Sequence, residues 1–524
     1  MTSFFNKYYS SIFSSRWFRN LIFPLLFLIL FQVYDLGTII NMHPQSLHIW
    51  RQTDCLSLTQ NYYDGTATFF RPEVHNQLSD NNSSGKTAGE FPLLYWFVAM
   101  LWRIFGKHES IFRVLGLLIA YGGLHSVYKI TYGLTGNLAV SLFTGLFPFT
   151  SPVFVNYSVS FLPNVPALSL AFSASYIFYL YSQNEKTGLL WISVLLFTLA
   201  ALLKISAGIL FVALTGWYII DLIIGIENKG VLHATLRRIT PFFTGWLIVA
   251  AWYIYASKYN HIHGGRYTFN SVWPIWELGF ADIKERLEDA RILWKDQVLA
   301  HWFLWISIAI WPLALLTWKK LSHFEKYLLI AVPAGTIIYL LLWFQALRDH
   351  DYYYAEILVP LLLSWIIIAR TISVSSNRYT RKISYLLLLL LTVAVIDCRS
   401  SMSDRFEGWM NGWYNNNLKA LYELSPRLRS LGIPEDAKII SIPDPSINAS
   451  LYILNRKGFN DFGSNFNEPG MVNDRISKGA SFLVINDMPG TENELLKPYL
   501  EYKIYSSGNV AIFDLRPYRM LPLK

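Results

Sequence analysis

Long apolar runs constrain this chain more than any other feature of its sequence. About eleven segments are near or above the roughly 17 apolar residues that a membrane-spanning helix needs. They lie near residues 18–38, 111–132, 137–157, 163–182, 187–203, 205–226, 240–258, 299–318, 326–347, 354–370 and 382–398. Only 15% of the residues are charged, whereas a soluble domain has about 25%. The sequence therefore predicts an α-helical polytopic membrane protein with about eleven transmembrane helices.

One further run, residues 91–105, is short, contains Arg103 and is rich in Trp and Tyr. If the N-terminus is cytoplasmic and this run lies flat on the outer surface, three basic clusters fall on the cytoplasmic side, as the positive-inside rule requires. If the run instead crosses the membrane, all three basic clusters move to the outer side. We therefore predict an interfacial helix at 91–105 inside an external first loop, 39–110. The clusters are Lys229, Arg237 and Arg238; Lys319, Lys320 and Lys326; and Arg370, Arg378, Arg381 and Lys382.

The composition changes from about residue 399, where Asp, Asn, Gly and Pro become frequent. Strand-like runs occur at 437–443, 450–454, 480–487 and 509–515, and a helix-like run at 417–432. Strands that alternate with helices favour a small α/β domain. We predict a transmembrane domain over 1–398 and an extracytoplasmic α/β domain over 399–524.

Charge and cysteine content narrow the classes of partner. The net charge is +9, but the basic residues are scattered singly or in pairs between apolar runs. This pattern argues against a nucleic-acid partner and fits cytoplasmic loops of a membrane protein. Two cysteines, Cys55 and Cys398, are too few for a disulfide framework, and we expect unpaired thiols.

Polar residues gather in the first external loop. The stretch from His43 to Glu90 holds Trp50, Arg51 and Asp54 close to the membrane. Charges near lipid are costly and usually mark a site. The alternative is a purely structural role, in which Asp54 holds the loop in place by pairing with Arg51 or by capping a helix.

Two more external positions carry unusual polar residues. Lys204 stands between two apolar runs, where it could bind a lipid phosphate or merely snorkel to the surface. The turn at 347–354 holds Arg348, Asp349, His350, Asp351 and Tyr352, a cluster that a bare connector does not need. His261 and His263 form an HxH pair, but zinc usually needs three or four ligands, so we assign no metal ligands.

The order of these motifs resembles the GT-C superfamily of membrane glycosyltransferases, which use polyprenyl-phosphate sugars. The nearest branch is that of bacterial protein O-mannosyltransferases and aminoarabinose transferases of the ArnT kind. The resemblance spans residues 18–400 and rests on WRQTDCLSLTQNYYDG at 50–65, GEFPLLYWFVAMLWRIFGKHESIFR at 89–113, FLPNVPA at 161–167, LLKIS at 202–206 and HDYYYAEILVP at 350–360.

The resemblance implies roles for individual residues. Asp54 corresponds to the acid of the first loop, which acts as catalytic base, although the family's acid often lies a few residues earlier. Glu90 matches the acid of an E-x-P element, while Phe91 replaces a lysine found in aminoarabinose transferases. Lys204 matches a lysine near the lipid phosphate. Asn164 replaces an aspartate of many relatives, which weakens the case for a shared metal; a divalent cation remains open and no other cofactor is implied.

The predicted function is therefore an inverting transfer of a hexosyl or pentosyl group from a polyprenyl-phosphate donor. The acceptor hydroxyl would belong to a protein, a lipid such as the lipopolysaccharide core, or another envelope glycan. The enzyme would be multi-pass in the cell inner (plasma) membrane, with its active site outside. A transporter or flippase of lipid-linked sugars is one alternative, but we see no internal repeat of the kind that transporters show. A scaffold for envelope assembly is another.

We predict substrate-binding roles for Arg51, Glu90, Lys204, Arg348, His350, Asp351 and Tyr352. The cations among them would stabilise the departing phosphate, and Asp54, with Asp351 in reserve, would accept the acceptor's proton. Asp54 and Lys204 should then converge on one pocket.

Overall fold

The computed structural model describes residues 16–225, 229–265, 271–373, 377–463, 468–487 and 494–520. Contacts within the chain divide it into two compact units. The helical unit comprises residues 1–42, 112–251 and 271–403, and the loop-and-sheet unit comprises 43–111, 252–270 and 404–524.

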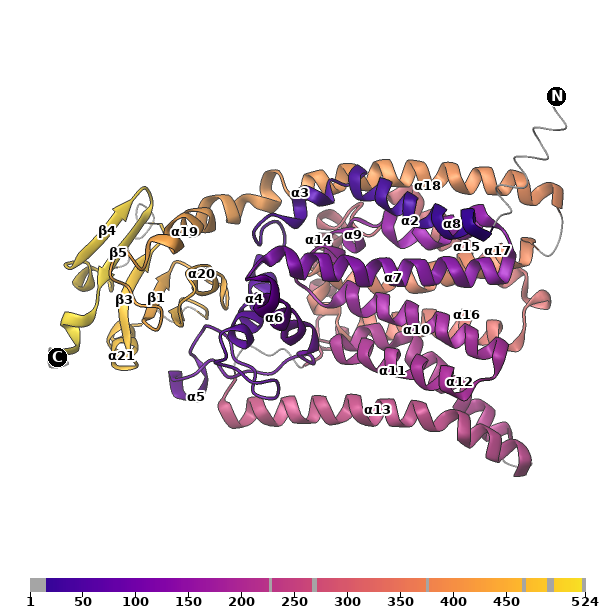
Figure 1. Cartoon of the computed structure of the whole chain (residues 1–524), viewed down its shortest axis with the longest axis horizontal. Helices are drawn as coiled ribbons and strands as arrows, with labels where there is room; N and C mark the ends of the chain where they lie inside the picture. The colour runs from indigo at the N-terminus through magenta and orange to yellow at the C-terminus, as the bar shows by residue number, and fades with distance from the viewer. Residues whose placement is uncertain are drawn as a thin grey trace. The chain divides into compact units, whose positions relative to one another are not determined.

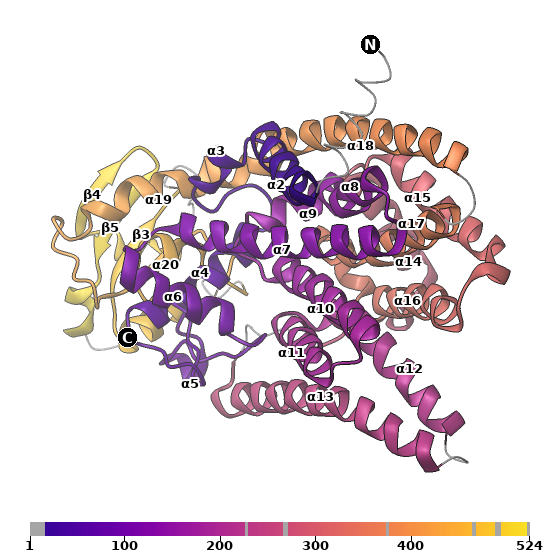
Figure 2. The same cartoon turned by 45° about the vertical axis from the view of Figure 1, so that its right-hand side comes forward.

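The helical unit is built from long apolar helices that run along a common direction (Figure 1). Within it α10 packs against α11, and α12 contacts both (Figure 2). The unit contains all or most of α2 (Arg16–Val33), α3 (Leu36–Ile40), α7 (Glu109–Thr135), α8 (Leu138–Leu146), α9 (Pro152–Ser158), α10 (Asn164–Asn184), α11 (Thr187–Leu203), α12 (Ile209–Gly225), α13 (Lys229–His263), α14 (Phe280–Leu293), α15 (His301–Leu316), α16 (His323–Leu342), α17 (Leu358–Ser373) and α18 (Asn377–Arg405).

Seven of the described helices are long and apolar enough to cross a membrane, and an eighth span results if α8 and α9 count as one. That pair is bent by 77° because a 3-10 turn, Phe147–Thr150, follows α8, after which the Ser151 hydroxyl caps the new helix. Shorter apolar helices cover Trp17–Val33, Thr187–Leu203 and His301–Leu316. Together these helices cover all the predicted runs, so the chain is a multi-pass helical membrane protein. The three short ones lie at the lower limit of about 17 residues that a span needs.

The predicted interfacial helix corresponds to α6 (Leu93–Phe105) in the loop-and-sheet unit. Its 13 residues are too few to cross a bilayer. It packs against α4 (Ile49–Tyr63), with Leu94, Val98 and Trp102 buried. Its position at the membrane surface stays a prediction.

The C-terminal segment forms a mixed five-stranded sheet in the order β2-β1-β3-β5-β4. Strand β1 pairs in parallel with β2 and β3, whereas β5 is antiparallel to β3 and β4. The strands are β1 (Lys438–Ile442), β2 (Gly458–Asn460), β3 (Ala480–Ile485), β4 (Lys503–Ser507) and β5 (Val510–Asp514), and the short helices of the unit are α5 (Ser79–Asn82), α19 (Lys419–Leu424), α20 (Ala449–Ile453) and α21 (Met471–Ser477).

Three of the four strand-like runs are strands, but the run at 450–454 is wrong, because it lies largely in helix α20. Its residues are buried on every side, and periodicity cannot distinguish strand from helix in so short an apolar run. The sequence also missed β2 and β4. The helix-like run at 417–432 contains α19 and a 3-10 turn rather than one continuous helix.

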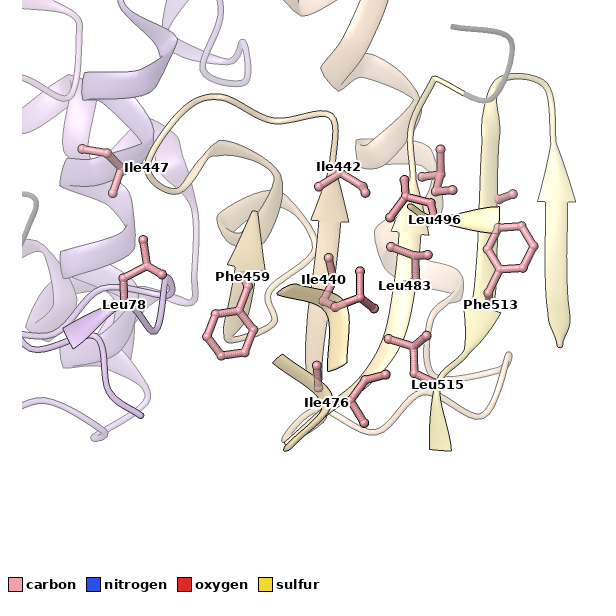
Figure 3. Close-up of a cluster of buried hydrophobic side chains, with 14 of the residues drawn as sticks. Leu78, Ile440, Ile442, Ile447, Phe459, Ile476, Leu483, Leu496, Phe513 and Leu515 are labelled. Carbon is pink, nitrogen blue, oxygen red and sulfur yellow. The ribbon is translucent and has the colours of Figure 1, made fainter. Parts of the chain in front are cut away.

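The first loop is part of the core beneath this sheet. Val74 and Leu78 pack in one hydrophobic cluster with Ile440, Phe459 and Leu483 (Figure 3). The loop also extends the edge of the sheet. Gly458 of β2 donates its N–H to the carbonyl of His75 at 3.1 Å and accepts from the N–H of Gln77 at 2.9 Å. The two chain segments therefore fold as one body.

Candidate functional site

Helix α4 carries Asp54 into the interior of the loop-and-sheet unit. The helix begins after His48, whose backbone is left-handed with φ 56°. Most of its buried residues are polar, Thr53, Asp54 and Ser57 among them. Buried polar groups must be hydrogen-bonded, and Asp54 Oδ1 accepts a hydrogen bond of 2.8 Å from Asn448 Nδ2. The residue Asp54 keeps 8% exposure and is buried.

Arg51 and Glu90 form an ion pair next to Asp54. Arg51 lies three residues before Asp54 on α4, a spacing that places both on one helix face. Its guanidinium donates to Glu90 Oε1, which also accepts the Tyr95 hydroxyl at 3.3 Å. The predicted residues of the first loop are thus brought together as one constellation with alternating charge.

Burial determines the proton affinity of Asp54. It raises the pKa of the Asp54 carboxyl to about 6, while Arg51 and the hydrogen bond from Asn448 act in the opposite direction. Asp444 and Glu90 raise it further, because a second negative charge disfavours ionisation. A carboxylate of this pKa is a stronger base than an ordinary aspartate and is still mostly ionised at neutral pH.

Lys204 lies in the helical unit, where it ends α11. Its extended backbone, with φ −156° and ψ 117°, separates α11 from a 3-10 turn at Ile205–Gly208. The ammonium lies 5.1 Å from the ring centroid of Tyr353 and 5.8 Å from that of Tyr352. Cations are held over aromatic faces in this range.

The predicted cluster at 347–354 is close to Lys204. Tyr352 stacks on His350 at 5.3 Å and makes an edge contact with Tyr157. The Tyr157 hydroxyl donates to Asp351 Oδ1 at 2.5 Å, and both of these residues are completely buried. Lys204, His350, Asp351 and Tyr352 therefore belong to one neighbourhood.

Arg348 stands apart from this neighbourhood. Its guanidinium pairs with Asp349 at 2.9 Å and is 35% exposed. Its main-chain carbonyl accepts the indole N–H of Trp294 at 3.0 Å. The Arg348 side chain therefore forms an ion pair at the surface with Asp349, and such a pair adds little to the stability of the fold.

The sequence did not single out Glu356. This carboxylate is fully buried near Lys204, and the Ser206 hydroxyl donates to its Oε1. Its Oε2 has no hydrogen-bond partner among the described residues. Lys204 stands in the motif LLKIS and Glu356 in the motif HDYYYAEILVP. The sequence therefore contained an acid that could have been considered as a partner of the lysine. Nothing in the sequence pointed to Asn448 or Asp444.

His263 of the HxH pair has an ordinary partner. His263 Nδ1 lies 2.8 Å from Asp80 Oδ1, and Lys86 pairs with the other oxygen of that carboxylate at 3.2 Å. Over the described ranges, no group of three or more His, Cys, Asp or Glu could hold a metal ion. Asn164, the position where relatives have an aspartate, is buried at the first residue of α10.

The two constellations belong to different units. Asp54, Arg51 and Glu90 lie in the loop-and-sheet unit, and Lys204 with its neighbours lies in the helical unit. Their predicted convergence on one pocket stays a prediction, as do the roles assigned to the individual residues.

Comparison with known proteins gives one family and one fold. Residues 88–254 match the family described as dolichyl-phosphate-mannose-protein mannosyltransferase. A search of curated proteins finds no match.

Among solved structures, the chain is similar to ArnT from Cupriavidus metallidurans in the apo state, with a TM-score of 0.58 and 12% identity over 96% of this chain and 99% of that one. The same protein bound to undecaprenyl phosphate gives a TM-score of 0.57 and 12% identity over 94% of this chain and 97% of that one. The Archaeoglobus fulgidus oligosaccharyltransferase tethered to an acceptor peptide gives 0.54 and 12% identity over 90% and 69%. These matches confirm the predicted GT-C type of fold and the resemblance to the mannosyltransferase and ArnT branch.

Proposed function

We propose that this chain, which has the ArnT-like fold and a segment that matches the mannosyltransferase family, is a membrane glycosyltransferase. Its donor would be a sugar linked to a polyprenyl phosphate, and its acceptor a hydroxyl of a protein, lipid or envelope glycan. Transfer would take place on the extracytoplasmic side of the cell inner membrane. The observation that carries the proposal is the buried Asp54 carboxylate, which lies beside an Arg–Glu pair in the loop that follows the first apolar helix. A similar protein, ArnT, has been solved with undecaprenyl phosphate.

The proposed reaction is a single displacement at the anomeric carbon. Asp54 accepts the proton of the acceptor hydroxyl as its oxygen attacks that carbon, and the bond from the carbon to the phosphate oxygen breaks. The products are the glycoside, with inverted configuration, and the polyprenyl phosphate. Because phosphate leaves as a stable anion, the reaction needs positive charge near the leaving oxygen more than a strong acid.

Arg51 and Lys204 are the stronger of the candidate cations for that charge. Arg51 is paired with Glu90, and Lys204 lies near Glu356. Each cation is thus balanced by a carboxylate in the structure, and a donor phosphate would have to compete with that carboxylate. Lys204 suits a phosphate as a compact point charge, whereas Arg51 can bind two oxygens at once. Arg348, in its surface pair with Asp349, is the weaker candidate.

The exposure of the two candidate bases favours Asp54. Asp351 is completely buried and accepts the Tyr157 hydroxyl. A base must come within hydrogen-bond reach of the hydroxyl that it deprotonates. Asp54 is also buried but retains 8% exposure, against none for Asp351, which makes Asp54 the better candidate.

The test is reconstitution of the purified chain in vesicles with labelled polyprenyl-phosphate sugars and an envelope extract. Covalent transfer of label, together with release of polyprenyl phosphate, supports the proposal. Movement of intact donor between leaflets without new glycosidic bonds would instead support a flippase. If the vesicles show neither activity and a strain that lacks the chain loses assembled envelope complexes, the result would support a scaffold. Mass spectrometry of envelope glycans from a strain that lacks the chain would then identify sugar and acceptor together.

A further inference from the structure

A loop of the C-terminal segment reaches Asp54. Residues 443–448 connect β1 to α20, and the last of them, Asn448, donates its amide to Asp54 Oδ1 at 2.8 Å. The two residues are 394 positions apart in the chain. Asn448 is completely buried, so this contact is part of an interior network rather than a surface pair. Helix α20, which follows directly, packs against α4.

The orientation of the Asn448 amide is fixed by its other partner. Its Oδ1 accepts the backbone N–H of Asn76 at 3.0 Å. A backbone N–H can only donate, so the amide oxygen must face it, and the NH₂ group must face Asp54. A flipped amide would place an oxygen against a carboxylate and a donor against a donor. The geometry therefore provides a donor that Asp54 cannot lose by a simple rotation of the side chain.

The network behind Asn448 holds the loop rigid. Asp444 Oδ1 accepts the backbone N–H of Ser446 at 3.0 Å, and its Oδ2 accepts that of Ser450 at 2.8 Å. Asn460 Nδ2 donates to Asp444 Oδ2 at 3.2 Å, and Asn76 Nδ2 donates to Asn460 Oδ1 at 2.8 Å. Fully satisfied networks of this kind restrict side chains to one arrangement.

The hydrogen bond leaves Asp54 with one oxygen for chemistry. Asn448 donates to Oδ1, so Oδ2 lies outside that hydrogen bond. A carboxylate held at one oxygen presents the other in a defined direction, as a base for a bound hydroxyl requires.

We propose that Asn448 is a positioning residue that fixes the direction of the Asp54 carboxylate and keeps it ionised. This inference rests on the proposed function, in which Asp54 is the base. The C-terminal segment would then contribute to the catalytic centre itself and not only to acceptor binding.

The charged and titratable groups that face Asp54 come from three directions. Arg51 and Cys55 lie on α4, Glu90 and Tyr95 lie before and on α6, and Asp444 lies on the loop before α20. Burial raises the pKa of Cys55 to about 12, so this thiol stays neutral beside Asp54. Among these groups, Arg51 favours the ionised carboxylate and the two acids oppose it. The amide of Asn448 is the neutral donor that adds to the effect of Arg51.

The experiment compares the pH dependence of kcat/KM for full-length variants in vesicles with a labelled polyprenyl-phosphate sugar. Asn448→Asp keeps an acceptor for the Asn76 N–H but replaces the donor by a second carboxyl. We expect the acid limb of the profile to move to higher pH by about one pH unit or more, with activity recovered in alkaline buffer. Asn448→Ser, which removes the donor without a new charge, should move the limb in the same direction by less.

Asn411→Ser is the matched control. Asn411 also joins the C-terminal segment to the first loop, since its Oδ1 accepts the backbone N–H of Ser46 at 2.9 Å and its Nδ2 donates to Gln45 at 3.0 Å, but it is not among the groups that act on Asp54. Lower thermal stability with an unmoved limb is expected. The inference is overturned if both Asn448 variants keep the wild-type limb, or if Asn411→Ser shifts it equally. Normal transfer by Asp54→Asn would refute the base assignment itself, so the two failures are distinguishable.

Discussion

The replacement Asp54→Asn separates a catalytic carboxylate from a structural one. Asparagine has nearly the same shape, and its oxygen can still accept the hydrogen bond from Asn448, so the loop contact is kept. What the variant loses is the negative charge and the ability to take a proton. If Asp54 is the general base, the rate of sugar transfer should fall by about 10²–10⁴-fold.

The stability of the same variant should move in the opposite direction. Burial raises the pKa of Asp54 from 3.8 to about 6 in the folded protein. The folded state therefore holds a proton more tightly than the unfolded state, and the stability that this proton adds is present below about pH 4 and is lost as the pH rises through about 6. A difference of this size corresponds to up to about 3 kcal/mol. At pH 7.5 the wild type bears this full penalty, and the neutral amide does not.

Two measurements check the reasoning. Thermal unfolding in detergent at pH 5 and pH 7.5 should give Asp54→Asn a stability equal to or above wild type, with the larger gain at pH 7.5. The wild-type pH–rate profile should rise through about pH 6, about tenfold per pH unit on its acid side, and the residual activity of the variant should lack this limb. Asp64→Asn is the matched control, because it removes an exposed carboxylate at the end of the same helix. An Asp54→Asn variant that is less stable than wild type at pH 7.5 would refute the stability argument. Normal sugar transfer by the folded variant would refute the assignment of Asp54 as the base.

Three further predictions follow from named contacts. Glu90→Gln removes a negative charge near Asp54, so the acid limb of the pH–rate profile should move to lower pH. Lys204→Met should raise the donor KM by about tenfold or more with little change in unfolding temperature, since the end of its helix is held by a backbone bond that any residue can make; an unchanged KM would exclude a phosphate contact. Gly458→Ala should lower stability by about 1–3 kcal/mol, because its Cβ would lie 1.9 Å from the carbonyl oxygen of Ile439; unaltered thermal unfolding would contradict that close approach.

The sequence predicted the helices well because their signal is local. A run such as 163–182 must be helical if it enters lipid, since only a helix satisfies every backbone group within one segment. A second local signal, short apolar runs bounded by turn residues, located the strands β1, β3 and β5. This signal failed at 450–454, where burial on all sides removed the periodicity that distinguishes a helix from a strand.

The surroundings of the site were less predictable because they depend on contacts between distant residues. Arg51 and Asp54 are three residues apart, and their proximity follows from helix geometry alone. The pairing of Arg51 with Glu90 needs the loop to return on itself, which the resemblance suggested but spacing could not. The contact of Asp54 with Asn448 requires residues 75–77 to join the edge of a sheet formed some 380 residues later, and no local pattern encodes that pairing.

If Asp54 is the base that we propose, this arrangement must make an aspartate basic without neutralising it. An exposed carboxylate near its ordinary pKa of 3.8 is fully ionised at neutral pH but attracts a hydroxyl proton weakly. Burial strengthens that attraction, yet unopposed burial would leave the group protonated and useless as a base. Arg51 and Asn448 limit the rise to about 6, where the carboxylate is both ionised and basic. One of these groups comes from the same helix and the other from the C-terminal segment, so the base strength of Asp54 depends on the folding of both chain segments into one unit.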